Sequence, residues 1–204
     1  MTTLITRPRY EETTHYLYVW TKDLITSGIK DGSILNLETS KVTRKNLESY
    51  LKKNAPNNVI INGHGSATVV TGQDGEIIIE SLKNDAILGN ANVYLRACEC
   101  ALDLGKRIVA NGAQGFIGYS QKFMFPIDPD NFMSRPLEDR WARPCMDASN
   151  AIIRSLPKNS SAREAHEAGL AAHEAELANA NTSEGNPLTA MCLAWNMAFQ
   201  TIIE

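Results

Sequence analysis

Two short apolar runs, each followed at once by glycine, histidine or cysteine, most constrain the fold of this chain. The first is VIINGHG at residues 59–65, and the second is NVYLRACEC at residues 92–100. The first part of each run, residues 59–61 and 92–97, is predicted as a strand covered on both faces, as in a parallel sheet, because its apolar residues do not alternate regularly with polar ones. Parallel strands need long crossovers, and helices are expected to supply them.

Strand and helix patterns alternate over the first two thirds of the chain and then give way to helices. Further strands are predicted at residues 16–20, 34–37 and 115–119, with a small hairpin at 67–70 and 76–79. Helices are predicted at residues 41–53, 101–110, 145–156, 161–179 (capped by Ser160 or Ser161) and 188–203. The last helix is apolar nearly all round and is expected to be buried against the sheet. The predicted fold class is a three-layer α/β/α sandwich with a mainly parallel sheet and a helical C-terminal portion.

The 204 residues suffice for one substantial core but not for two comfortable domains. We predict a single domain over residues 1–204, with a sheet core at about 15–120, an irregular excursion at 121–144 and a helical tail at 145–204. The hydrophobic fraction of 43% and the charged fraction of 21% are ordinary for a globular protein. A net charge of -3 with no basic stripe gives no reason to expect nucleic acid or a membrane surface as partner.

Targeting signals and metal motifs are not expected in this sequence. Residues 1–14 are charged and lack the apolar segment of a secretory signal, and no run approaches the roughly 18 apolar residues of a membrane span. Four cysteines are too few for a disulfide scaffold, so reduced thiols and a cytoplasmic location are expected. No cofactor or metal is expected: the Cys98–Cys100 pair lacks further ligands at suitable spacing. His166 and His173 do not form a zinc motif, since position 170 is Leu, and they are expected on a solvated or interfacial helix face.

A thiol and an imidazole follow the two apolar runs. His64 lies just beyond the third predicted strand and Cys98 directly after the fourth, so neighbouring strands would bring both side chains to the carboxyl edge of the sheet. A base beside a thiol favours nucleophilic catalysis. The glycines on both sides of His64 let a substrate approach, and the N–H groups of Gly65 and Cys98 are expected to form an oxyanion hole. Cys98 is also expected near the N-terminus of the following helix, whose partial positive charge favours thiolate.

These two blocks resemble the caspase-like cysteine peptidases, a group that includes caspases, legumain, gingipains, clostripain and separase. In that group one hydrophobic strand ends in His-Gly and the next in Ala-Cys, as VIINGHG and VYLRACEC do here. The run RACECALDLGKRIVANGAQGFIGYS is most similar to the bacterial CHAT branch. The resemblance implies a cysteine endopeptidase with His64 as base, Cys98 as nucleophile and Gly65 as oxyanion donor. Cys98 is preferred to Cys100 because it directly follows Ala97. The resemblance also implies a regulated, sequence-selective enzyme of a bacterial defence or cell-death pathway.

Weaker hypotheses concern substrate selection and processing. Asp23, taken to follow the first strand, is a candidate for binding a basic substrate residue, and Glu99 is a second candidate substrate-binding residue. The excursion at 121–144 is a candidate substrate loop or processing segment. Its arginines are candidate self-cleavage points, namely Arg135, Arg140 and Arg143.

Two alternatives to an endopeptidase stay open. A non-catalytic caspase-like module would bind a protein partner through the same cleft or through the helical tail. A thiol acyltransferase or another amide hydrolase would use the same two residues. The expected partners are a protein or peptide substrate and an activating or inhibiting protein.

Overall fold

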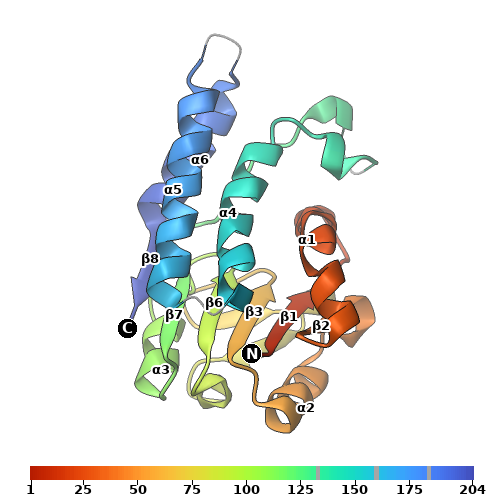
Figure 1. Ribbon diagram of the computed structural model, residues 1–204, viewed down its shortest axis with the longest axis vertical. Helices are drawn as coiled ribbons and strands as arrows, with labels where there is room; N and C mark the ends of the chain where they lie inside the picture. The colour runs from red at the N-terminus through yellow and green to blue at the C-terminus, as the bar shows by residue number, and fades with distance from the viewer. Residues whose placement is uncertain (132–133, 159–160, 183–184) are drawn as a thin grey trace.

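The computed structural model describes residues 1–131, 134–158, 161–182 and 185–204. Its central sheet has six strands in the order β2-β1-β3-β6-β7-β8, and a two-stranded hairpin, β4-β5, lies beside it. The strands are β1 (Thr3–Arg7), β2 (Ile34–Glu38), β3 (Asn58–Asn62), β4 (Val69–Thr71), β5 (Ile77–Glu80), β6 (Asn92–Arg96), β7 (Gly115–Tyr119) and β8 (Gln200–Ile203). The helices are α1 (Glu12–Asp31), α2 (Arg44–Asn54), α3 (Leu104–Ala110), α4 (Arg143–Ser155), α5 (Ala162–Ala180) and α6 (Pro187–Phe199) (Figure 1).

The sheet is parallel from β2 to β7, and only β8 runs antiparallel to its neighbour. Helices cover both of its faces. Leucines of α2 and α3 pack with the hairpin on one face, and apolar residues of α1, α4 and α5 pack on the other. The predicted α/β/α sandwich with a mainly parallel sheet and a helical C-terminal portion is therefore confirmed.

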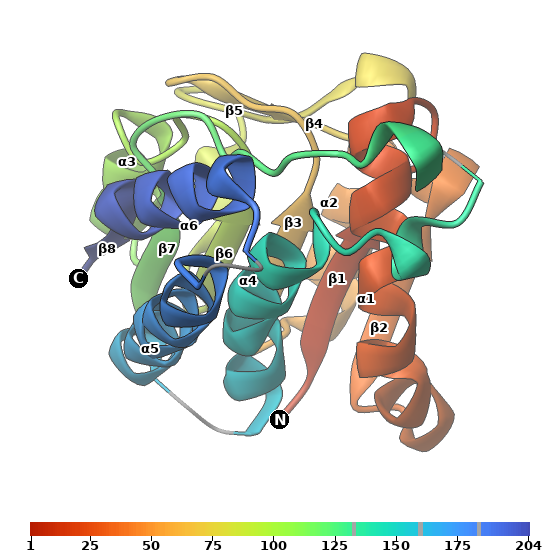
Figure 2. The same cartoon turned by 90° about the horizontal axis from the view of Figure 1, so that it is seen from above.

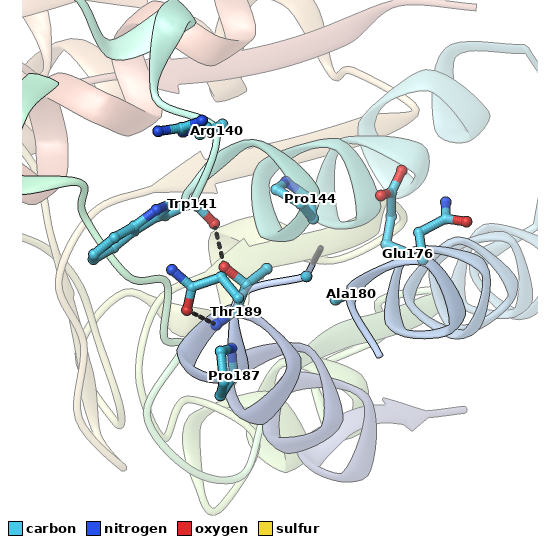
Figure 3. Close-up of a pocket in the computed structure, with 10 residues that line it drawn as sticks. Arg140, Trp141, Pro144, Glu176, Ala180, Pro187 and Thr189 are labelled. Carbon is cyan, nitrogen blue, oxygen red and sulfur yellow. Dashed lines mark hydrogen bonds between the residues drawn. The ribbon is translucent and has the colours of Figure 1, made fainter. Parts of the chain in front are cut away.

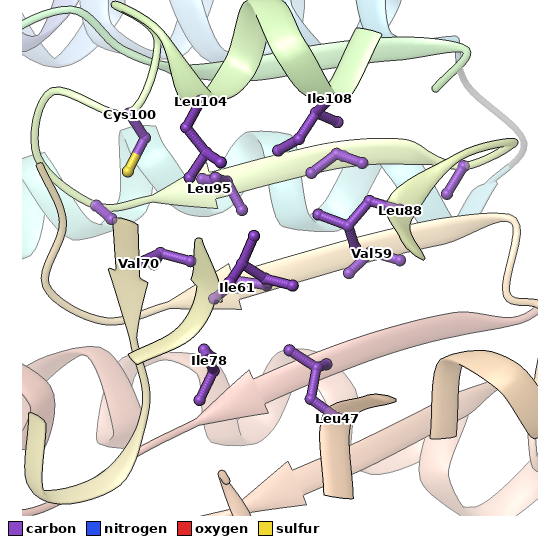
Figure 4. Packing of buried hydrophobic residues seen from close by; sticks show 14 of the residues in the cluster. Leu47, Val59, Ile61, Val70, Ile78, Leu88, Leu95, Cys100, Leu104 and Ile108 are labelled. Atoms are coloured by element: carbon purple, nitrogen blue, oxygen red, sulfur yellow. The ribbon is translucent and has the colours of Figure 1, made fainter. Parts of the chain in front are cut away.

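Alternation along the inner strands divides their side chains between the two layers. In β3, Val59 and Ile61 face the hairpin layer while Ile60 faces α4. In β6, Leu95 likewise faces the hairpin layer, in the cluster shown in Figure 4. The runs are apolar without a break because both faces are covered.

The first predicted strand, residues 16–20, is wrong: these residues lie inside α1. The side chain of Glu11 caps this helix by accepting from the backbone N–H groups of Thr13 and Thr14. The buried residues of the helix recur at helical rather than strand spacing, namely Tyr16, Leu17, Trp20 and Ile25. The chain's true first strand is β1, which is buried at all five positions.

The C-terminal prediction is wrong in two respects. Residues 200–203 form β8 at the edge of the sheet instead of continuing the helix. The preceding helix α6 is not enclosed, since Leu188 is 50% and Met191 is 53% exposed. The predicted strands at 34–37, 59–61, 92–97 and 115–119 and the hairpin at 67–70 and 76–79 are confirmed within one or two residues at their ends.

The helix α5 packs along α4, side by side in Figure 1. Ser161 caps it together with Glu164, whereas Ser160, the other predicted cap, lies outside the described residues. His173 is buried and its Nδ1 lies 2.8 Å from the carbonyl oxygen of Gly169, while Nδ1 of His166 lies 3.0 Å from Nε2 of Gln200 in β8. Of the two predicted environments for these histidines, the interfacial one is right. Among the described helices, none is both long and apolar enough to cross a bilayer.

Candidate active site

The strands that precede His64 and Cys98 are neighbours, as predicted. β3 and β6 pair in parallel, with Asn62 opposite Arg96, and the Gly63 N–H donates to the Arg96 carbonyl oxygen at 3.5 Å. His64 and Cys98 each follow this matched pair by two residues. Both therefore leave the sheet at its carboxyl edge, from adjacent strands, where α/β proteins bind ligands.

Gly65, which follows β3, packs closely against the turn that follows β6. A Cβ atom on Gly65 would lie 2.6 Å from Cys100 Sγ and 2.7 Å from the Cys98 carbonyl oxygen, so only glycine fits against this turn. Among the hydrogen bonds of the described residues, neither the Gly65 N–H nor the Cys98 N–H donates to an acceptor. Both N–H groups are thus available to a negatively charged oxygen bound between them.

The His64 ring is paired with a carboxylate that the sequence analysis missed. Nε2 of His64 lies 3.2 Å from Oε1 of Glu11, with the two side chains 44% and 36% exposed. Burial acts to raise the pKa of Glu11, but hydrogen bonds from the backbone N–H groups of Thr14 and Thr13, and the charge of His64, hold it below its usual value. Glu11 is therefore ionised at neutral pH.

An ionised carboxylate accepts hydrogen bonds only, so the contact with Glu11 assigns the ring hydrogen of neutral His64 to Nε2. The lone pair then lies at Nδ1, which is the atom available to take a proton. Within the described residues no hydrogen bond joins the His64 ring to the Cys98 thiol. Catalytic hydrogen bonds are often long in free enzymes and shorten when substrate binds.

The Cys98 thiol is half-buried and neutral at rest. Burial raises its pKa, and Glu99 raises it further, whereas the backbone N–H of Phe123 and the charge of Lys122 lower it. The expected help from a helix N-terminus is wrong, because α3 begins only at Leu104. Residues 98–103 form turns instead.

The neighbouring thiol, Cys100, is not available for chemistry. Its side chain is fully buried against the hairpin, near Val70 and Leu104 (Figure 4), and its Sγ contacts the carbonyl oxygen of Val69 at 3.7 Å. Burial raises the pKa of Cys100 to about 12. Of the two thiols in this turn, only Cys98 is accessible.

Glu99 adopts a left-handed backbone conformation, with φ of 59°. Such a conformation is uncommon for a residue with a side chain. Its backbone N–H donates to the carbonyl oxygen of Gln121 at 3.1 Å, so the segment after β7 helps to hold the turn in place. The conformation orients the backbone of the adjacent Cys98.

The segment after β7 crosses the sheet edge above Cys98. Figure 2 shows it running from β7 past β6 and β3 toward α1. Phe123 packs against Tyr119 with ring centroids 5.0 Å apart, and Phe125 packs against Tyr16 at 5.4 Å. The excursion predicted at 121–144 is irregular in its described part, with short 3-10 turns at Pro129–Asn131 and Pro136–Glu138. Residues 132 and 133 lie outside the described residues.

Asp23 does not lie at this edge. It was expected there because it was taken to follow a strand, but it is an exposed residue within α1. Its role as a substrate-binding residue therefore loses its basis.

Two hollows lie on the surface near these elements. One, of about 260 Å³, is lined by Arg9, Tyr10, Glu11 and His15 and so borders the pair that Glu11 forms with His64. The other, of about 550 Å³, lies at the ends of α4, α5 and α6, where Trp141, Glu176 and Thr189 line it (Figure 3). Across the described ranges, no group of three or more His, Cys, Asp or Glu side chains is placed to hold a metal ion.

The fold and this edge together define an α/β/α sandwich with a thiol and a carboxylate-paired imidazole on adjacent strand ends. No protein-family model matches the chain, and no curated protein matches it. Among solved structures, it is similar to a secreted C11 cysteine protease from Bacteroides thetaiotaomicron, determined with an irreversible peptide inhibitor. The TM-score is 0.49 at 10% sequence identity, and the match covers 94% of this chain and 63% of that one. The present chain thus spans less than two thirds of that protein's length.

Proposed function

We propose that this chain is a cysteine peptidase with Cys98 as nucleophile and His64 as its acid and base. The observation that carries the proposal is the pairing of Asn62 with Arg96, because it brings the residues two positions further along to one edge. Gly65, packed against the turn that holds Cys98, supports the same arrangement.

The reaction follows from the atoms available. Nδ1 of His64 takes the thiol proton, and the Cys98 sulfur attacks the carbonyl carbon of the peptide bond. The backbone N–H groups of Gly65 and Cys98 donate to the resulting oxyanion. The protonated ring then gives its proton to the leaving amine, and an acyl-enzyme remains. His64 next removes a proton from water, which attacks the acyl carbon and releases the thiolate, and the ring's proton returns to sulfur.

Glu11 acts as a positioning residue in this scheme. It fixes the ring hydrogen at Nε2 and stabilises the imidazolium that forms when Nδ1 is protonated. The carboxylate is itself held by the first turn of α1. It therefore keeps its place when the ring changes charge.

The segment after β7 contacts the half-buried nucleophile, which supports the predicted regulation of the enzyme. The Phe123 N–H contacts Cys98, and burial keeps the thiol protonated. The sulfur is partly exposed, and a substrate or an activating protein that moves Phe123 would expose it further. Self-cleavage at Arg135, Arg140 or Arg143, membership of the CHAT branch and a role in bacterial defence stay predictions from the sequence.

An irreversible peptidyl probe tests the proposal. The probe is incubated with the wild type, Cys98→Ala and Cys100→Ala, and the labelled residue is located by mass spectrometry. We expect labelling of the wild type and Cys100→Ala and none of Cys98→Ala. Labelling that persists in Cys98→Ala contradicts the assignment of the nucleophile.

The alternatives use the same surface. A thiol acyltransferase would transfer the acyl group from Cys98 to an added amine more readily than to water, which product analysis with and without the amine detects. A non-catalytic binding module would leave peptide substrates intact in both the wild type and a variant whose crossing segment is loosened, such as Phe123→Ala.

A further inference from the structure

The first residues of the crossing segment lie between two elements, the turn that carries Cys98 and the helix α6 (Figure 2). The backbone N–H of Ala101 in the turn donates to the Tyr119 carbonyl oxygen at 3.1 Å. The backbone N–H of Glu99 in the same turn donates to the Gln121 carbonyl oxygen, also at 3.1 Å. The odd-numbered residues of this stretch therefore bond to the turn.

The even-numbered residues of the same stretch bond to α6. The Ser120 N–H donates to the Phe199 carbonyl oxygen at 3.0 Å. Two residues further on, the Lys122 carbonyl oxygen accepts from Nε1 of Trp195 at 2.9 Å. The turn and the helix thus hold alternate residues of one stretch from opposite sides.

The side chain of Asn196 bonds to both backbone groups of Met124. The Met124 N–H donates to Asn196 Oδ1 at 2.9 Å, and Asn196 Nδ2 donates to the Met124 carbonyl oxygen at 2.6 Å. Asn196 is 0% exposed, so both bonds are closed to water. Because hydrogen bonds are directional, two bonds to one residue fix the orientation of its backbone.

Phe123 lies between the two residues that Trp195 and Asn196 hold. Its place in the alternation turns its backbone toward the turn, and its N–H contacts the Cys98 sulfur. With Lys122 and Met124 both fixed to α6, this N–H is held toward the sulfur. An N–H group donates more strongly to a thiolate than to a thiol, because hydrogen bonds to ionised acceptors are the stronger ones.

We propose that Asn196 and Trp195 of α6 are positioning residues, which hold the Phe123 N–H against the Cys98 sulfur so that it donates to the attacking thiolate. The catalytic meaning of this contact rests on the peptidase activity proposed above. The Phe123 N–H is the group that touches the reacting atom, and the two side chains of α6 act through it. His64 takes the thiol proton, and the Phe123 N–H stabilises the charge left on sulfur.

The pH dependence of Cys98 alkylation tests the proposal in Asn196→Ala. The rate of modification by iodoacetamide is measured by mass spectrometry at pH 8 and pH 10, and the ratio of the second rate to the first is compared with that of the wild type. Access to the sulfur affects both rates of one protein equally and cancels in the ratio, whereas the thiolate fraction does not. Loss of the donor raises the pKa of Cys98, so we expect a ratio at least about twofold larger than in the wild type.

Asn58→Ala is the matched control for Asn196→Ala. Asn58 is equally buried and its Nδ2 donates to the Leu156 carbonyl oxygen at 3.1 Å, but it begins β3 and so lies at the opposite edge of the sheet from the site. Both variants keep Glu99 and Lys122, the charged side chains that shift the pKa of the Cys98 thiol. Asn58→Ala should lose stability but keep the wild-type ratio.

Trp195→Phe provides a second variant that disturbs the fold less. It removes the donor to the Lys122 carbonyl oxygen and keeps a ring beside Phe199, and it should change the ratio in the same direction as Asn196→Ala. Circular dichroism at both pH values shows whether each variant is folded. If Asn196→Ala does not fold, Trp195→Phe decides.

The outcomes separate this proposal from the peptidase activity. An unchanged ratio in the folded α6 variant, or the same change in Asn58→Ala, overturns the role of α6. Such a result leaves the peptidase standing, because iodoacetamide needs a thiolate but no peptidase activity. If peptidyl probes fail to label Cys98 of the wild type, the peptidase is wrong, and the catalytic role of α6 is wrong with it whatever the ratio.

Discussion

Nε2 of His64 lies 3.2 Å from Oε1 of Glu11, and the two residues follow the neighbouring strands β3 and β1. The chain proceeds from β1 to β2 on one side and then returns to place β3 on the other. This reversal is where open α/β sheets form a crevice at their carboxyl edge. Glu11 and His64 therefore lie together at the one boundary of the sheet best suited to a site.

Glu11→Gln should lower peptidase activity with little change in KM. The amide can donate to Nε2 and so stabilises the other tautomer, in which the lone pair lies at Nε2 and Nδ1 carries the hydrogen. A positioned acid–base contributes about 10²–10⁴-fold, and we expect kcat to fall by about 10²-fold. Steady-state kinetics with a peptide substrate measure the effect.

Glu12→Gln is the matched control for Glu11→Gln. It changes the next residue, which lies in the first turn of the same helix. It should leave kcat within about twofold, as expected for a surface substitution away from the site. Equal losses in the two variants would show that helix stability, not the contact with His64, is responsible.

The unfolding free energy of the wild type should decrease at acidic pH, in part because Glu11 becomes protonated. The pKa of Glu11 is held below its ordinary value of 4.5, so its ionised form contributes stability above that value, and this contribution is lost as the pH falls through the lower, folded-state pKa. Urea unfolding at pH 7 and pH 3.5 should show a smaller acid loss in Glu11→Gln than in the wild type. The same acid loss in both proteins would contradict the assignment.

The inner strands of the sheet could be predicted from the sequence because their apolar runs are short and uninterrupted. Residues 16–20 are rich in aromatic and β-branched residues, a composition that favours strands. In the structure they are helical, because the cap at Glu11 and the helical spacing of Tyr16, Leu17 and Trp20 outweigh that preference. That spacing was present in the sequence. Because residues 16–20 were predicted as the first strand, β1 was missed and Asp23 was expected at the carboxyl edge of the sheet.

Some residues of the candidate site could likewise be predicted from the sequence, and others could not. His64 and Cys98 were predictable because each directly follows an identifiable strand. Glu11 precedes His64 by 53 residues and contacts it only once β1 and β3 pair. The place of Phe123 likewise depends on the packing of α6 against the crossing segment, which no local pattern reveals.

Alkylation should distinguish the four thiols of the folded protein. Iodoacetamide should modify Cys98 first, because Cys100, Cys145 and Cys192 are buried. The rate at Cys98 should still be rising above pH 9, since burial raises the pKa of this thiol above its ordinary 9.0 and only the thiolate reacts. Mass spectrometry over a pH series measures the rate. A plateau below pH 8 would mean that the resting thiol is already ionised.

Phe123→Ala should make Cys98 more reactive while it destabilises the fold. The substitution removes the ring contacts with Tyr119 and Phe125, so the crossing segment is held less firmly above the sulfur. We expect about 1–3 kcal/mol lower unfolding free energy and severalfold faster labelling of Cys98. Leu51→Ala, which removes a buried side chain of α2 on the opposite face of the sheet, is the control. It should lose stability without faster labelling.

Gly65→Ala should abolish activity beyond its effect on stability. The added Cβ would lie 2.6 Å from Cys100 Sγ and 2.7 Å from the Cys98 carbonyl oxygen, so the turn that carries the nucleophile has to move. Overpacking of this kind costs about 1–3 kcal/mol of stability. Gly28→Ala is the control: its Cβ would lie 2.5 Å from the Ile34 side chain, far along the chain from the site. Both variants should unfold at a lower urea concentration than the wild type. Under conditions where both variants are folded, only Gly65→Ala should lose labelling of Cys98 by a peptidyl probe. Retained labelling in Gly65→Ala would mean that the turn carrying Cys98 tolerates the added Cβ and that the close packing of Gly65 is not needed for the site.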